Sequence, residues 1–284
     1  MQKILGLALG GGAALGLAHI GVLNVLEEEG LAPSLLAGSS AGSLAAAFYC
    51  AGASIQTMRE IALRLHWKGL QKATLPILAL STNEPLGHFL KHLLPVRDFD
   101  ALRLPLRIVT TDLLTAEMVV FEGGPPFAPR GEIHDPDVVF ARGDLIEVLR
   151  ASCARPVITH PVRIGERLLV DGGLSCNVPA QLVRDMGADI VVAVDLHTRR
   201  WKNERPRNLI AYAAQSQAIS LHWTIKDRRI AADVVIRPDF GALSGPEFNE
   251  REAIIRSGEQ AARAAVPRIR ALFSSVSCPA DRPR

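Results

Sequence analysis

The chain has 284 residues, of which 48% are hydrophobic and 21% charged, so it carries enough apolar material for a globular core. A net charge of +3 and an aromatic content of 5% argue against a nucleic-acid partner, which needs a basic surface or stacking platforms. The four cysteines have neither metal-ligand spacing nor the density of a disulfide framework, so we expect no metal and a reducing, cytoplasmic environment.

Two apolar stretches near the N-terminus could be mistaken for targeting or membrane segments. Residues 1–26 have the composition of a signal peptide, but the stretch continues into His19 and a helix-like face without a clear cleavage site. Residues 31–53 are about long enough to span a bilayer, but they contain Pro33 and a run of small residues. We therefore expect both stretches to be buried elements of a globular domain.

The sequence pattern in the first third of the chain predicts short buried strands that alternate with helices. The first strand ends at Gly10-Gly11-Gly12, and the second runs into Gly38-Ser39-Ser40-Ala41-Gly42. Residues 54–97 are helical in patches, which predicts either a lid or substrate-facing region or an additional helical layer on the core. The other elements predicted here are strand 3–9, helix 16–29, strand 34–37 and helix 43–51.

The rest of the chain continues the alternation of strands and helices, without an internal repeat or a long linker. This pattern predicts an α/β fold with a mostly parallel or mixed sheet, helices on both faces and one domain over residues 1–273. The polar tail 274–284 is predicted to be disordered. The elements predicted here are strands 104–110, 117–121, 162–164, 168–170, 190–194 and 234–236, and helices 144–152, 208–229 and 250–273 with a kink at Pro267.

The pentapeptide at 38–42 has the form G-x-S-x-G. Gly38 and Gly42 would allow a sharp strand-to-helix turn that projects the Ser40 hydroxyl out of the sheet. The following helix N-terminus favours negative charge that develops beside it. These features predict a nucleophilic serine, and the alternative is a tight packing turn with a buried Ser40.

Two kinds of base would suit Ser40. His197 and His222 lie late enough for a Ser-acid-His triad, but only one strand and one helix precede Ser40, whereas that fold places several strands first. Asp171 follows a predicted strand, and Gly172 and Gly173 would let its backbone approach another loop. A carboxylate in a dry site can act as a general base, so Asp171 is the alternative to a histidine, or else part of a plain turn.

The glycines at 10–12 lie after a strand and before a helix, which is a geometry that binds anions. Their N–H groups would suit an oxyanion hole or the pyrophosphate of a dinucleotide. The dinucleotide reading is weaker because the strict glycine pattern fails at Ala13. The acidic residues at 27–29 also lie on the first helix rather than after the next strand.

Taken together and in this order, the motifs resemble the patatin-like phospholipase family, and most of all its single-domain bacterial branch. The resemblance covers about residues 3–270 and rests on six segments: Leu9-Gly10-Gly11-Gly12-Ala13-Ala14-Leu15-Gly16, Ala18-His19-Ile20-Gly21-Val22-Leu23, Gly38-Ser39-Ser40-Ala41-Gly42-Ser43, Ala151-Ser152-Cys153-Ala154 leading to Pro156, Val170-Asp171-Gly172-Gly173-Leu174, and Asn177-Val178-Pro179. It implies a three-layer α/β/α fold and a serine esterase that needs neither a metal nor a cofactor.

The resemblance also implies a role for each matching residue. Ser40 corresponds to the nucleophile, Asp171 to the base of a Ser-Asp dyad, and Gly10, Gly11, Gly12 and Ala13 to the oxyanion hole. The implied substrate is a lipid or acyl ester. Many members carry Arg or Lys at the position of Leu15, so neutral esters or lysolipids gain weight over charged phospholipids. The alternative function is a catalytically weak lipid-binding or regulatory protein on the same scaffold.

Three other features are left open by the sequence. His19 is expected to pack on a helix beside the glycine loop, and Arg155 suits either the active site or a surface ion pair. The basic residues at 199–207 fit either a peripheral contact with anionic lipid head groups or a solvated loop.

Overall fold

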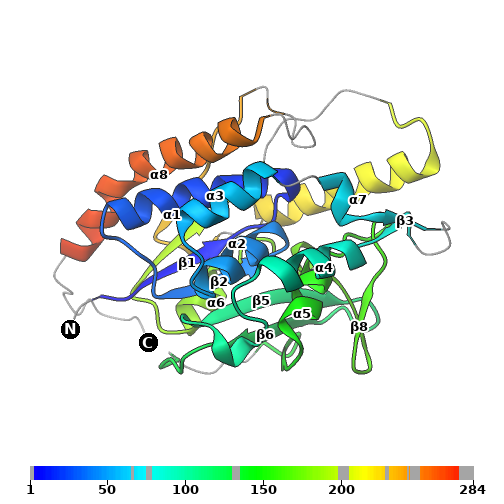
Figure 1. Ribbon diagram of the computed structural model, residues 1–284, viewed down its shortest axis with the longest axis horizontal. Coiled ribbons are helices and arrows are strands. Elements are labelled where there is room, and N and C mark those ends of the chain that lie inside the picture. The colour runs from blue at the N-terminus through cyan, green and yellow to red at the C-terminus, as the bar shows by residue number, and fades with distance from the viewer. Residues whose placement is uncertain are drawn as a thin grey trace.

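The apolar strands form the middle layer of the computed structural model, and helices cover the sheet on both faces (Figure 1). The structure describes residues 3–64, 67–74, 79–129, 135–197, 205–227, 230–241, 243 and 250–274. The predicted three-layer α/β architecture with a mostly parallel central sheet is thereby confirmed. The last ten residues of the predicted disordered tail and part of the basic cluster at 199–207 lie outside the described residues.

Five strands run parallel in the order β11-β10-β1-β2-β5. Every residue of β1, β2, β5 and β10 is buried, as expected for strands that are covered on both faces. The bounds of these strands are Leu5–Leu9 (β1), Leu35–Ser39 (β2), Leu106–Asp112 (β5), Ile190–Val194 (β10) and Val234–Ile236 (β11).

The sheet becomes mixed on the far side of β5. Strand β6 (Met118–Gly123) pairs antiparallel with β5, and β7 (Val138–Ala141) pairs parallel with β6. Strands β8 (Val162–Ile164) and β9 (Arg167–Asp171), which match the strands predicted at 162–164 and 168–170, form an antiparallel hairpin, and β9 also pairs antiparallel with the end of β5. Strand β5 therefore has three neighbours, because β2 and β9 occupy successive parts of one edge.

The side chains of β1 alternate between two apolar clusters. Leu5, Leu7 and Leu9 pack into the larger cluster, whereas Ala8 packs into the smaller one on the opposite face. Helix α6 (Ala180–Asp185) belongs to the smaller cluster. The helices of the larger cluster are α1 (Ala18–Glu28), α2 (Ala41–Cys50), α3 (Ile55–Arg64), α4 (Glu84–Leu93), α5 (Leu145–Ser152) and α8 (Arg251–Ser274).

The segment predicted as patches of helix at 54–97 is partly helical. Helices α3 and α4 bury Met58, Ala62, Leu86 and Leu90 in the larger cluster, so they do form a helical layer on the core. Between them lie a 3-10 turn (Trp67–Leu70) and a two-stranded antiparallel ribbon, β3 (Lys72–Ala73) with β4 (Ser81–Thr82), which the sequence did not predict. Residues 75–78 lie outside the described part of the chain.

Helix α7 (Leu209–Asp227) lies at the end of the molecule opposite the N-terminus (Figure 1). The long helices at 208–229 and 250–273 were both predicted, and α8 continues through Pro267. Within the described ranges, no helix combines the length and the apolar composition that crossing a membrane would require.

Candidate active site

Ser40 lies in a strained turn between β2, which ends at Ser39, and α2, which begins at Ala41. Its φ of 52° and ψ of −125° are rare for a residue with a side chain and cost about 1–3 kcal/mol. Two serine hydroxyls hold the turn: Ser152 Oγ accepts from the Ser40 N–H at 2.9 Å, and Ser43 Oγ donates to the Ser40 carbonyl at 2.6 Å. The surrounding structure thus stabilises a conformation that Ser40 would not adopt by itself.

The glycines of the pentapeptide allow neighbouring backbones to approach this turn. A Cβ atom on Gly42 would overlap the Leu9 carbonyl at the end of β1, and one on Gly38 would lie 2.6 Å from the Gly42 carbonyl oxygen. The sequence argument that these two positions need glycine is therefore confirmed by the packing.

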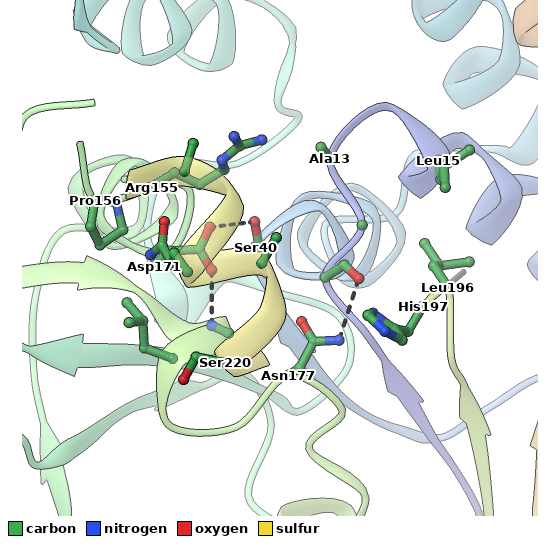
Figure 2. A pocket seen from close by; sticks show the side chains of 17 residues that line it. Ala13, Leu15, Ser40, Arg155, Pro156, Asp171, Asn177, Leu196, His197 and Ser220 are labelled. Carbon is green, nitrogen blue, oxygen red and sulfur yellow. Dashed lines mark hydrogen bonds between the residues drawn. The ribbon is translucent and has the colours of Figure 1, made fainter. Parts of the chain in front are cut away.

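Strand β5 brings Ser40 and Asp171 together across 131 positions of the chain. Ser39, the last residue of β2, pairs with Val109, and Asp171, the last residue of β9, pairs with the next residue, Thr110. The Ser40 hydroxyl donates to Asp171 Oδ2 at 2.7 Å, as Figure 2 shows. The base candidate that contacts Ser40 is thus the aspartate.

Asp171 is only 7% exposed, and burial raises the pKa of its carboxyl group. The Gly173 N–H, which donates to Oδ1 at 2.8 Å, opposes this rise, as do the Ser40 hydroxyl and the charge of Arg155. A carboxylate with a raised pKa has a higher proton affinity than an exposed aspartate and is a better general base at neutral pH.

A cysteine lies beside Ser40 but does not compete with it. Cys153 and Ser40 line the same small cavity, and burial together with the charge of Asp171 raises the pKa of the thiol far above neutrality. Because the thiolate is the reactive form of cysteine, Cys153 stays in its unreactive form.

The glycine loop offers fewer free donors than the sequence suggested. The Gly10 N–H donates to the Val194 carbonyl at 3.0 Å, and the Gly11 N–H donates to the Asn177 carbonyl at 3.1 Å. These two N–H groups are engaged within the fold and are not available to a substrate. Gly12 and Ala13, which has a φ of 49°, remain as candidate donors and line the pocket above Ser40.

His19 supports the glycine loop from behind. It is fully buried on α1 and its Nε2 lies 2.8 Å from the Gly10 carbonyl oxygen, so Nε2 carries the proton and donates. Burial lowers the pKa of the imidazole to about 4, which keeps it neutral. The expectation that His19 packs on a helix beside the loop is confirmed.

The two histidines considered for a triad bind each other. His197 Nε2 lies 2.7 Å from His222 Nδ1, whereas the Ser40 hydroxyl is directed at Asp171. His197 lines the pocket, but the Ser40 hydroxyl donates to Asp171 and not to His197.

Ser40 and Asp171 open into a pocket of about 400 Å³. Figure 2 shows Ser40 and Asp171 in its interior, between Arg155 and Pro156 on one side and Ala13 and Leu15 on the other. Of the two alternatives for Arg155, the structure supports a place at the site, because its charge acts on Asp171. Over the part of the chain that is described, no group of three or more His, Cys, Asp or Glu side chains could hold a metal ion.

Two supporting residues had no role predicted from the sequence. Ser152 Oγ accepts from the Ser40 N–H, and the Asn177 carbonyl accepts from the Gly11 N–H while the Asn177 side-chain amide lies 3.5 Å from the Gly11 carbonyl oxygen. The only signal for either residue was its place in a segment that resembles a family motif.

A three-layer α/β fold with a hydrogen-bonded serine and aspartate at the carboxyl edge of its sheet has the parts of a serine hydrolase. The family model described as patatin-like phospholipase matches residues 7–184. The chain therefore belongs to the patatin-like phospholipase family, whose members are generally lipid hydrolases.

Individual relatives agree with this assignment. The chain is 31% identical over 198 residues to patatin-like phospholipase domain-containing protein 6 of Homo sapiens, which covers 67% of this chain and 13% of the relative. It is 32% identical over 238 residues to an uncharacterized NTE family protein of Mycobacterium tuberculosis, which covers 76% of this chain and 59% of the relative. The chain thus spans only part of the length of these relatives.

Among solved structures, VipD from Legionella pneumophila has a similar fold, with a TM-score of 0.52 and 15% identity. The likeness covers 95% of this chain and 67% of VipD and concerns the fold alone.

Proposed function

We propose that this protein is a serine lipid acyl hydrolase in which Ser40 is the nucleophile and Asp171 the general base. The observation that carries the proposal is the 2.7 Å hydrogen bond from the Ser40 hydroxyl to a buried carboxylate with a raised pKa. The strained turn at Ser40 adds support, because strain that the surrounding structure maintains is typical of functional sites.

The proposed reaction proceeds through a covalent intermediate. Asp171 takes the hydroxyl proton as Ser40 Oγ bonds to the ester carbonyl carbon, and the carbonyl oxygen becomes an oxyanion facing the N–H groups of Gly12 and Ala13. When the carbonyl reforms, the bond to the alcohol breaks and the alcohol oxygen receives the proton from Asp171. Water then loses a proton to Asp171 and attacks the acyl carbon, and Ser40 leaves with that proton as the fatty acid is released.

The proposed substrate is a neutral acyl ester or a lysolipid. Leu15, which stands where many family members carry a cation, lines the pocket near the glycine loop and offers no charge to a phosphate. Arg155 also lines the pocket, and its charge lowers the pKa of the Asp171 carboxyl group.

The proposal includes a peripheral contact with a lipid surface through α7. Tyr212, Ile219 and Trp223 are 61%, 43% and 51% exposed, and their spacing places them on one face of the helix. Ala214 and Gln217, on another face, line the pocket. Exposed Arg205 and Arg207 precede the helix and suit anionic head groups. An aromatic face beside the pocket would bring the site to a membrane-borne substrate.

Labelling with a fluorophosphonate probe tests the nucleophile. We expect the wild-type protein to form one adduct, on Ser40, and Ser40→Ala to form none, whereas the control Ser216→Ala, on the exposed part of α7, labels normally. Hydrolysis of a soluble nitrophenyl ester should fall about 10²–10⁴-fold in Asp171→Asn, because a general base is lost. A folded wild-type protein that neither labels nor hydrolyses esters would instead support a lipid-binding or regulatory role.

The pH profile of kcat/KM tests the role of Asp171. Only the carboxylate form can accept the proton, so activity should fall as the pH drops through a pKa that burial raises. Arg155 lowers this pKa, so Arg155→Gln should move the acidic limb of the profile to higher pH. Arg163→Gln, with an exposed arginine on β8, is the matched control. An acidic limb that stays in place in Arg155→Gln would contradict the assignment of Asp171.

A further inference from the structure

Ser40 lines one of two neighbouring cavities of different character. The first is the pocket of about 400 Å³, whose lining combines apolar residues with the polar side chains of Arg155, Asp171, Asn177 and His197; we name it the polar pocket to distinguish it from the second. The second, of about 100 Å³, lies between the glycine-loop side of the core and the helices α3 and α4. Every residue that lines this second cavity is Ala, Gly, Leu, Ile, Phe or Met.

A narrow passage joins Ser40 to the apolar cavity. A space of about 30 Å³ is lined by Ser40 and Ala13, by the polar residues Gln71, Asn83 and Arg155, and by Leu44 and Leu86, which also line the apolar cavity. The passage therefore reaches from the hydroxyl that is proposed to attack the ester to the apolar cavity, with polar side chains on part of its wall.

We propose that the acyl chain of the substrate occupies this apolar cavity, beneath α3 and α4, while the alcohol portion occupies the polar pocket. The inference rests on the proposed function and adds the location of the chain. It also gives helices α3 and α4 a role as the wall of a substrate site. An acyl chain in the polar pocket would desolvate Asn177 and Gln217 without replacing their hydrogen bonds, which is unfavourable, whereas the apolar cavity exposes no such groups.

The size of the cavity predicts a preferred chain length. Since an apolar cavity of roughly 150 Å³ holds one benzene molecule, a volume of about 100 Å³ has room for about four carbon atoms. With the carbonyl carbon at Ser40 and one more carbon in the passage, the chain that fills the space has about six carbons.

The far wall of the cavity limits longer chains. Ile61 and Phe89 line both the apolar cavity and an outer pocket of about 360 Å³, which also contains Glu60 and Arg64. A chain of more than about six carbons must displace this wall and then pass charged side chains.

Rates on a series of soluble nitrophenyl esters, from acetyl to dodecanoyl, test the inference. For the wild-type protein we expect kcat/KM to rise about fourfold per methylene up to about hexanoyl, since each methylene leaves water, and then to level or fall. Ala62→Leu, which adds side-chain volume inside the cavity, should reduce the hexanoyl rate about tenfold and leave the acetyl rate within about twofold.

Phe89→Ala should have the opposite effect, because it removes part of the far wall, and should move the optimum to octanoyl or longer. Leu93→Ala, one helical turn further on α4, lines the outer pocket but not the apolar cavity and is the matched control. A variant that folds poorly loses rate on all esters equally, so the ratio of hexanoyl to acetyl rates separates misfolding from a change in the cavity.

The outcomes are distinguishable. If wild type and Ser40→Ala hydrolyse the esters equally slowly, the proposed function fails. If wild type is active but neither Ala62→Leu nor Phe89→Ala changes the dependence on chain length, the hydrolase remains and the acyl site is wrong.

Discussion

Two long helices of this protein differ in what their surfaces contact. Helix α8 has 24 residues and lies along α1, whereas α7 has 19 residues and lies at the other end of the molecule beside the pocket (Figure 1). Gly258 on α8 and Gly21 on α1 each face the backbone of the other helix so closely that a Cβ atom would not fit. Arg263 and Arg270 of α8 then pair with Glu28 and Glu29 at 2.6 and 2.5 Å.

The sequence of α7 contains no glycine. It carries no Asp, Glu, Lys or Arg from Leu209 to Ile225, and Leu209 and Tyr212 are 80% and 61% exposed. An exposed helix face without charges is costly in water unless it meets a partner. Helix α8 therefore uses its surface to pack on the fold, whereas α7 lines the pocket with one face and exposes apolar side chains on another.

The largest expected effect is on the contact between α8 and α1. Gly258→Val places a side chain against the Ala18 carbonyl, so the helices must separate. Overpacking of this kind costs about 1–3 kcal/mol or more, and thermal denaturation should show a Tm lower by about 5–10 °C. Gln260→Val, at an exposed position of α8, is the control and should change the Tm by about 2 °C or less. If Gly258→Val and Gln260→Val had the same Tm, close packing against α1 would not be the feature by which α8 stabilises the fold.

An intermediate effect is expected on α7, and on lipid binding rather than stability. The double variant Tyr212→Ser with Trp223→Ser should bind vesicles that contain phosphatidylglycerol about 10- to 100-fold more weakly, because two half-exposed aromatic side chains no longer leave water. Cosedimentation in a Ser40→Ala background, which keeps the lipid intact, measures this change. The Tm should fall by no more than about 4 °C, because Trp223 also packs against the His222 ring.

Leu63→Ser, at an exposed leucine of α3, is the matched control and should bind vesicles normally. If the double variant binds as the control does, and wild type instead associates with itself at high concentration through α7, then the partner of this face is a second copy and not a lipid surface.

The smallest effect is expected for the ion pairs of α8. Arg263 is 53% exposed, so Arg263→Ala should lower the stability by about 0.5 kcal/mol or less, a change of about 2 °C in the Tm. The small loss of stability in Arg263→Ala should shrink at high salt, which screens exposed charges, whereas the larger loss in Gly258→Val should be the same at low and high salt. A large loss in Arg263→Ala would mean that charge, not close packing, fixes α8.

The sequence predicted best the elements whose pattern is local. Strands at 190–194 and 234–236 agree with β10 and β11 to the residue, because continuous apolar runs are typical of buried parallel strands. Strands β3, β4 and β7 were not predicted, since two to four residues carry no periodicity and their pairing is supplied by a distant partner.

The same distinction applies to the candidate site. Ser40 and Asp171 were chosen from turn chemistry and family resemblance, and the structure places them in contact. That the N–H groups of Gly10 and Gly11 are engaged could not be foreseen, because their acceptors, Val194 and Asn177, lie more than half the chain away. Hydrogen bonds of this kind depend on tertiary structure, which a local sequence pattern does not specify.

The pairing of β5 with both β2 and β9 also has a consequence for folding. A slip of β9 by one residue would turn the Asp171 carboxylate to the opposite face of the sheet and remove the hydrogen-bond partner of the Ser40 hydroxyl. The serine and the aspartate meet only when three strands from distant parts of the chain are in register. A newly made chain therefore carries both side chains from the start, but they form their hydrogen bond only once its sheet is complete.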